Sequence, residues 1–139
     1  GLGLLLTMIA WFISDLVLNN FIYQSAEGFT LFTGGSFFIY ASIVLIFGLG
    51  TIVMKKVDFP RVVAGSLGAT FIFFVLSNLG VWAQNIMYPM TFGGLVACYT
   101  AALPFLKYTL AGDLFYSGLL FLAYGRYMRS LLREDKITR

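Results

Sequence analysis

The chain has 139 residues, of which 60% are hydrophobic, 18% aromatic and 11% charged, with a mean hydropathy of +0.89 and a formal net charge of +3. A soluble domain carries about 25% charged residues, so this composition excludes an ordinary soluble domain and indicates an integral membrane protein. The sequence has no histidine, which excludes histidine-based acid–base chemistry and histidine-ligated metal or haem within this segment.

Apolar stretches follow one another along the whole chain. A membrane-crossing helix needs about 20 apolar residues, which leaves no room for a separate soluble domain. The sequence predicts an all-α fold, a single transmembrane domain over residues 1–139. Its five spans lie at about 2–18, 36–54, 62–83, 90–105 and 108–127, and a basic tail follows at 128–139. The chain begins with Gly1 and lacks a signal-peptide pattern, so it is expected to be trimmed at its N-terminus.

Polar residues set the boundaries of the first three spans. The segment 19–35 ends the first span, and Lys55 with Lys56 stops the second. Pro60 marks the start of the third, because proline and charged residues are typical of a helix boundary. The third span ends at Gln84.

The last apolar segment is too long for one crossing. A single helix over residues 92–127 would be about 53 Å long, against a hydrocarbon core of about 30 Å. Pro104 lacks an amide donor and clashes with the preceding turn, so the sequence predicts a hairpin tip at residues 104–108. Lys107 then lies at the water interface.

A candidate substrate-binding site follows from this hairpin. Asp113 would lie about a turn and a half inside the fifth span, where a carboxylate costs roughly 2.5–3.5 kcal/mol and must face protein or a polar cavity. Thr109, four residues earlier, would line the same wall. The predicted substrate-binding residues are Tyr99, Lys107, Thr109 and Asp113. A buried carboxyl group that is only hydrogen-bonded to neighbouring helices is the alternative for Asp113.

If successive spans cross the membrane in opposite directions, the polar residues fall into two layers, one toward each membrane face. One layer is predicted to be a structural polar cluster, formed by Asp15, Asn78 and Trp82. The predicted binding residues lie toward the opposite membrane face. In this topology the basic residues are divided almost equally between the two faces, so the positive-inside rule decides little, and the tail is placed inside.

The sequence patterns typical of helix packing are stronger than those typical of catalytic or binding chemistry. Gly93, Ala97 and Ala101 are spaced by four residues, and so are Gly94, Cys98 and Ala102, and small residues at this spacing let helix backbones approach closely in lipid. Cys98 is therefore interpreted as a small packing residue, with a thiolate ligand for a soft metal as the alternative.

Catalytic signatures are absent from the sequence. It contains no G-x-S-x-G motif, no phosphate-binding loop and no C-x-x-C pair. We therefore expect no enzyme, no cofactor, no metal site and no nucleic-acid partner. The basic tail is typical of a membrane-surface segment.

A dense set of motifs carries a resemblance over nearly the whole chain. The motifs are Ser14-Asp15-Leu16, Ser77-Asn78, Val81-Trp82, Tyr88-Pro89, Gly94-Leu95, Cys98-Tyr99, Pro104-Phe105, Thr109 and Gly112-Asp113-Leu114. The chain resembles a family of small bacterial membrane proteins of unknown function, which is similar to the substrate-binding (S) components of energy-coupling factor vitamin transporters. The resemblance implies a six-helix bundle in the bacterial inner membrane with a vitamin near the extracellular face, docked on a transmembrane coupling subunit and two ATPases. This chain lacks the family's first helix with its Asn-Phe-x-Pro motif.

Two functions follow as expectations. The first is a small-molecule (vitamin-like) binding membrane component of a transporter, with membrane lipid, a ligand, a coupling subunit and ATPases as partners. The alternative is a non-catalytic accessory or structural subunit of a larger membrane protein complex. An enzyme that acts on lipid ranks last, because no catalytic constellation occurs.

Overall fold

The computed structural model describes residues 2–22 and 29–137, with side chains as far as residue 128. Its helices are α1 (Leu2–Val17), the π-helix η1 (Leu18–Ile22), α2 (Ser36–Val53), α3 (Phe59–Ala83) and α4 (Phe92–Ile137). The described residues form no strand, which confirms the all-α prediction. Four segments are long and apolar enough to cross a membrane: Leu2–Ile22, Ser36–Val53, Phe59–Ala83 and Phe92–Met128. The chain is therefore an integral membrane protein with four candidate spans.

The start of α3 shows why these residues begin a helix where they do. Asp58 is the N-cap, with an extended backbone, and its side chain accepts a hydrogen bond from the Arg61 amide at 3.0 Å. Pro60 occupies the first turn, where its missing amide hydrogen costs no hydrogen bond. The Arg61 guanidinium closes the turn by an ion pair to Asp58, Nε to Oδ2, at 3.3 Å. The helix therefore begins at Phe59, three residues before the predicted start of the span at residue 62, with Pro60 in its first turn.

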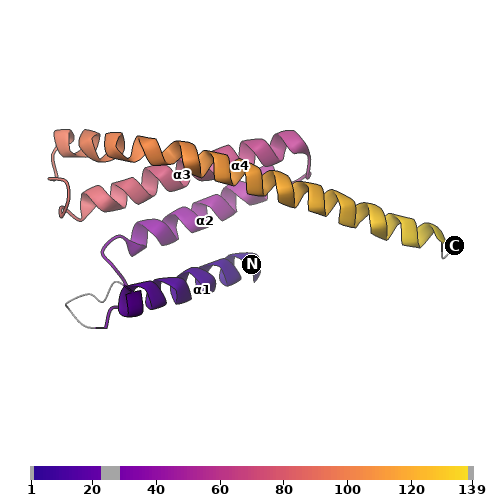
Figure 1. Cartoon of the computed structure of the whole chain (residues 1–139), viewed down its shortest axis with the longest axis horizontal. Helices are drawn as coiled ribbons and strands as arrows, with labels where there is room; N and C mark the ends of the chain where they lie inside the picture. Colours follow the sequence, from indigo (N-terminus) through magenta and orange to yellow (C-terminus); the bar gives the residue numbers. More distant parts are fainter. Residues whose placement is uncertain (1, 23–28, 138–139) are drawn as a thin grey trace.

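The predicted hairpin at residues 104–108 is wrong, and the described residues contain four candidate spans where five were predicted. Helix α4 runs without a break through Pro104. The proline side chain is exposed on the outer surface of the helix, so it does not disturb the contact with the rest of the bundle. Membrane helices tolerate an internal proline because neighbouring groups satisfy the freed backbone. The long segment does not fold back; it extends beyond the bundle instead, as Figure 1 shows.

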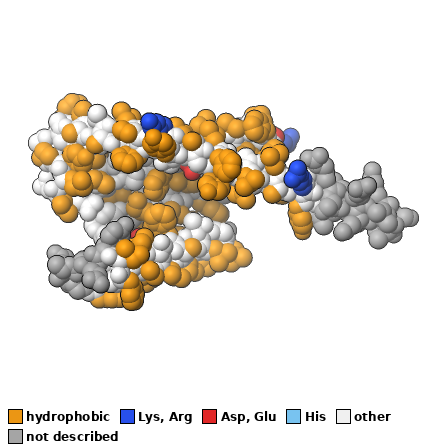
Figure 2. Space-filling model, in the orientation of Figure 1, with side chains coloured by type: hydrophobic (Ala, Val, Ile, Leu, Met, Phe, Trp, Pro, Cys, Tyr) orange, Lys and Arg blue, Asp and Glu red, His pale blue; other side chains and the backbone are white. Residues whose placement is uncertain are grey.

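Small residues make the contacts between the central helices. Helix α3 packs against α2 and against α4, and α4 packs against no other described helix. A Cβ atom on Gly68 would lie 2.7 Å from the Leu49 side chain on α2, and one on Gly65 would lie 2.7 Å from the side chain of Met54, the C-cap residue of α2. The buried side chains are small and mostly polar: Ser36, Ser42, Ser66, Thr70 and Cys98. Large apolar side chains cover the outside (Figure 2), as expected for a surface that faces lipid.

Basic residues gather at one end of the bundle. The connection between α2 and α3 carries Lys55 and Lys56, and the N-terminus of α1 and the long extension of α4 lie toward the same end (Figure 1). The extension includes Arg126 and the basic residues that follow it. The sequence contains no Lys or Arg at 18–35 or at 84–91, the two connections at the opposite end. The loss of the hairpin therefore replaces an even distribution of charge with a strongly one-sided one.

Candidate functional site

The four predicted substrate-binding residues do not converge on one pocket. The Tyr99 hydroxyl donates to the Val75 carbonyl on α3 at 2.7 Å. Asp113 accepts a hydrogen bond from Thr70, which is also on α3. Since Tyr99 and Asp113 are 14 positions apart on one continuous helix, they lie about 20 Å from each other along its axis.

Lys107 and Thr109 lie on the exposed surface of α4. The Lys107 ammonium group lies 4.8 Å from the centre of the Tyr108 ring, on its own helix. The Thr109 hydroxyl donates to the Phe105 carbonyl at 3.2 Å, also on its own helix. The prediction that Thr109 shares a wall with Asp113 rested on their spacing of four residues on one helix, but Thr109 is exposed whereas Asp113 is half-buried against α3. Neither Lys107 nor Thr109 faces the bundle.

Asp113 instead belongs to a cluster of oxygen atoms between α3 and α4. The Thr70 hydroxyl, on a side chain only 2% exposed, donates to Asp113 Oδ2 at 2.5 Å. The Thr70 oxygen also lies 3.0 Å from the Ser66 carbonyl oxygen. The hydroxyls of Ser66 and Ser117 are 3.4 Å apart. The sequence analysis identified the carboxylate as a candidate, but it did not single out the facing hydroxyls on α3.

The predicted polar cluster of Asp15, Asn78 and Trp82 is not joined by hydrogen bonds among the described residues. The Asn78 amide donates to the Phe74 carbonyl of its own helix at 2.7 Å. The Trp82 indole donates to the Pro89 carbonyl in the following loop at 3.1 Å, as expected for an indole that needs a partner. Asp15 lies on α1, a helix that packs against α2. Two of the three residues therefore have structural hydrogen bonds, made separately.

The predicted division into two depth layers also needs correction at the start of α4. Cys98 is buried, and its thiol donates to the Asn78 carbonyl at 3.4 Å. Tyr99 follows it and contacts Phe74, with ring centres 5.7 Å apart. Tyr99 therefore lies near the Asn78 layer and not at the opposite face, because α4 starts at the end of the bundle where α3 finishes.

The two small-residue ridges of α4 have different environments. Gly94, Cys98 and Ala102 face α3, and the first two of them are buried. The other ridge, formed by Gly93, Ala97 and Ala101, is exposed along its whole length. One ridge thus makes the internal helix contact, and the other is open to the surroundings of the bundle.

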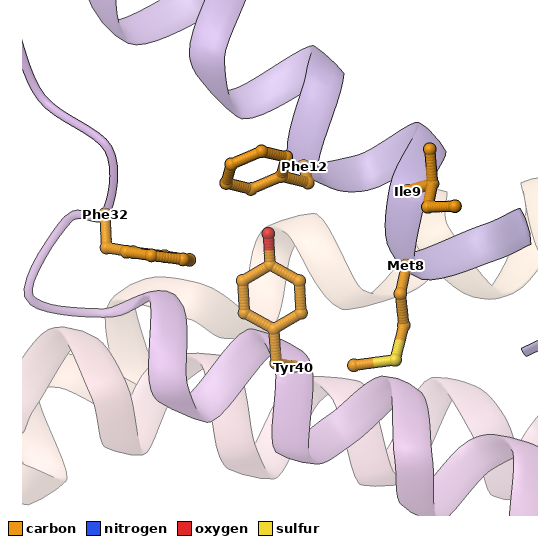
Figure 3. A pocket seen from close by; sticks show the side chains of 5 residues that line it. All are labelled: Met8, Ile9, Phe12, Phe32 and Tyr40. Carbon is orange, nitrogen blue, oxygen red and sulfur yellow. The ribbon is translucent and has the colours of Figure 1, made fainter. Parts of the chain in front are cut away.

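A cavity that sequence reasoning missed lies between α1 and α2, and much of it is open to the surroundings of the bundle. Its volume is about 380 Å³, and it is lined by Met8, Ile9, Phe12, Phe32 and Tyr40. Figure 3 shows the hydroxyl of Tyr40 pointing away from α2 toward Phe12, with the Phe32 ring beside it. The ring centres of Phe12 and Phe32 are 5.6 Å apart, and those of Phe32 and Tyr40 are 6.1 Å apart. The rings of Phe12 and Phe32 thus lie close to the Tyr40 hydroxyl.

The Tyr40 hydroxyl is the unusual feature of this cavity. Its oxygen is buried and has no hydrogen-bond partner among the described residues. Leaving a buried polar group unsatisfied costs about 1–3 kcal/mol, so most such groups are paired. The signal in the sequence was weak, because a tyrosine near the start of a span resembles an interfacial anchor.

The end of α1 next to this cavity has an irregular backbone and one buried polar group that has no partner among the described residues. The π-helix η1 follows α1 directly, and single π-turns are frequent at functional sites. The Asn19 side-chain nitrogen in it is buried without a partner in the described part of the chain. Asn20 fixes the segment by donating to the carbonyls of Leu16 and Thr30, each at 2.9 Å.

Comparison with known proteins identifies a family whose function is unknown. Within the described residues, no group of three His, Cys, Asp or Glu side chains could hold a metal ion. No curated protein and no solved structure matches the chain. One family, described as a family of unknown function (DUF6580), matches residues 1–133. Because the match covers nearly the whole sequence, the chain belongs to this family.

Proposed function

We propose that the protein is a non-catalytic, small-molecule-binding membrane component of a transporter, and that its ligand occupies the cavity between α1 and α2. The observation that carries this proposal is the buried hydroxyl of Tyr40, a residue that lines the cavity: it points toward Phe12 and has no hydrogen-bond partner among the described residues. A bound ligand would supply the missing hydrogen bond and so offset the cost of burying the hydroxyl.

The size and chemistry of the cavity fit a small ring-containing molecule. Ligand sites in proteins are mostly apolar cavities of about 300–1,000 Å³ with a few placed polar groups. The cavity here has a volume of about 380 Å³ and aromatic walls from Phe12 and Phe32. Aromatic side chains favour stacked or edge-to-face contacts with another ring. The expected ligand is therefore a flat ring with one hydrogen-bonding atom for Tyr40.

The position of the cavity in the membrane agrees with this role. Phe32 and Tyr40 lie near the connection between α1 and α2, at the end of the bundle opposite to Lys55 and Lys56. A cytoplasmic location of the basic end, as the positive-inside rule favours, would put the cavity toward the outer face. The resemblance to S components, which hold a vitamin near the extracellular face, supports the same location.

Tyr40→Phe tests the proposal, because it removes one oxygen atom and keeps the ring. We expect the ligand-free protein to gain about 1 kcal/mol of unfolding free energy, since an unsatisfied hydroxyl is lost. We expect ligand retention to fall by about tenfold, the equivalent of one hydrogen bond of 1.4 kcal/mol. The measurements are thermal unfolding of the purified protein and mass spectrometry of the small molecules that co-purify with it.

Tyr116→Phe is the matched control, because it removes the same hydroxyl group from a tyrosine on the exposed surface of α4. It should alter neither stability nor ligand retention. If Tyr40→Phe and wild type retain the same molecules in the same amounts, the cavity is not the binding site.

A second candidate function rests on the exposed ridge of α4. Gly93, Ala97 and Ala101 form a surface that allows close approach of another membrane helix. This surface favours an accessory subunit that packs against a larger membrane complex. Native mass spectrometry of the gently extracted protein would distinguish the two functions. A fixed set of integral subunits without a retained small molecule would favour the accessory role.

A further inference from the structure

The charge of Asp113 has no partner in the described part of the chain. The ion pair that the structure shows there joins Arg61 to Asp58, at the start of α3. Asp113 lies half-buried on the side of α4 that contacts α3, and from Val62 to Leu106 the sequence has no charged residue. A carboxylate at this depth needs a counter-charge or a polar environment.

No neighbouring side chain can supply that counter-charge. Helix α3 is the only described helix that packs against α4, and its residues 62–83 carry no titratable acid or base. On α4 itself, the nearest such groups are Lys107, Tyr108 and Tyr116, and all three are exposed. Lys107 is six positions from Asp113, which places it on a different side of the helix.

A series of oxygen contacts joins the carboxylate to α3 instead. The Thr70 hydroxyl contacts Asp113 and the Ser66 carbonyl, and the Ser66 hydroxyl lies 3.4 Å from the hydroxyl of Ser117 on α4. Carboxylate, hydroxyl and carbonyl oxygens are the groups that hold Na⁺ and H⁺ in membrane transport proteins. The cluster is therefore chemically suited to a small cation and unsuited to an organic ligand.

The hydrogen-bond arrangement points the same way. The Thr70 hydroxyl has one hydrogen but two acceptors within reach, Asp113 Oδ2 at 2.5 Å and the Ser66 carbonyl at 3.0 Å. A proton on Asp113 would satisfy both contacts, because the carboxyl group would donate to Thr70 and Thr70 to Ser66. A sodium ion would satisfy the oxygens by direct coordination.

We propose that Asp113, Thr70, Ser66 and Ser117 form a site for one exchangeable monovalent cation, H⁺ or Na⁺, between α3 and α4. The site is separate from the cavity between α1 and α2 and does not depend on the function proposed for it. It gives the protein an ion-linked element within the membrane.

The test measures the unfolding temperature of the full chain in detergent, with NaCl exchanged for choline chloride and, separately, across a range of pH. In wild type, a rise of several degrees with Na⁺ identifies sodium as the cation, and a dependence on pH alone identifies the proton. Asp113→Asn, which keeps the shape of the side chain, should abolish either dependence. Equal responses of wild type and Asp113→Asn to both ions would overturn the proposal.

A second pair of variants keeps the test valid if Asp113→Asn does not assemble. Thr70→Val should weaken the ion response, because it removes a hydroxyl from the site and keeps the side-chain volume. Thr109→Val makes the same change on the exposed side of α4 and should leave the response intact. Identical ion responses of these two variants would also overturn the proposal.

Discussion

Replacing Gly94 with alanine is expected to destabilise the protein by about 3 kcal/mol or more, near the upper end of the effects of overpacking. Gly94 is buried in the first turn of α4, where a Cβ atom would overlap the backbone carbonyl oxygen of Pro89. That carbonyl cannot move freely, because it accepts hydrogen bonds from the Trp82 indole at 3.1 Å and from the Thr91 amide at 2.7 Å. The added methyl group should therefore break the joint between α3 and α4. Thermal unfolding monitored by tryptophan fluorescence measures the loss.

Gly93→Ala is the matched control for this prediction. It is the adjacent residue in the same helical turn, and its added Cβ would meet only the Thr91 hydroxyl, at 3.9 Å. Because alanine favours a helix more than glycine does, Gly93→Ala should be neutral or slightly stabilising. Equal stability of the two variants would show that the packing of Pro89 against Gly94 does not constrain the fold.

The features of the fold that could be predicted from the sequence are those set by local chemistry. Membrane insertion followed from composition, and the boundary at Pro60 followed from the capping chemistry of Asp58 and Arg61. The hairpin at Pro104 failed because two rules were given too much weight. A proline does not have to end a membrane helix, and a helix longer than the hydrocarbon core can extend into water.

The candidate site was harder to predict, because its residues are joined only by the packing of helices. Asp113 was found as an intramembrane carboxylate, but its partner Thr70 is 43 residues earlier and has no distinguishing pattern. Tyr40 differs from an interfacial anchor only in the burial of its hydroxyl. Burial and facing partners are tertiary properties, so a single sequence could indicate the chemistry of these positions and not their neighbours.

The second large prediction concerns the side of the membrane on which the α4 extension lies. A residue in the extension is on one side or the other, so the expected labelling is all or none. In the four-span structure, α4 crosses once, so residue 130 lies on the same side as Val57 in the connection between α2 and α3. A hairpin at residues 104–108 would instead return it to the side of Ile86. The four-span arrangement also collects nearly all the basic residues on one side, in agreement with the positive-inside rule.

Single-cysteine labelling measures this arrangement directly. Cys98 is the one native cysteine and is buried, so Cys98→Ala provides the background. Into it we would introduce Val57→Cys, Ile86→Cys or Ser130→Cys, and treat sealed membrane vesicles of both orientations with a maleimide that cannot cross lipid. The positions Val57 and Ile86 serve as controls, because they lie in connections at opposite ends of the bundle. We expect Ser130→Cys to react from the side of Val57→Cys and to be protected from the side of Ile86→Cys. The reverse result would restore the fifth span and return Lys107 to a membrane interface, because α4 would then have to turn back near Pro104.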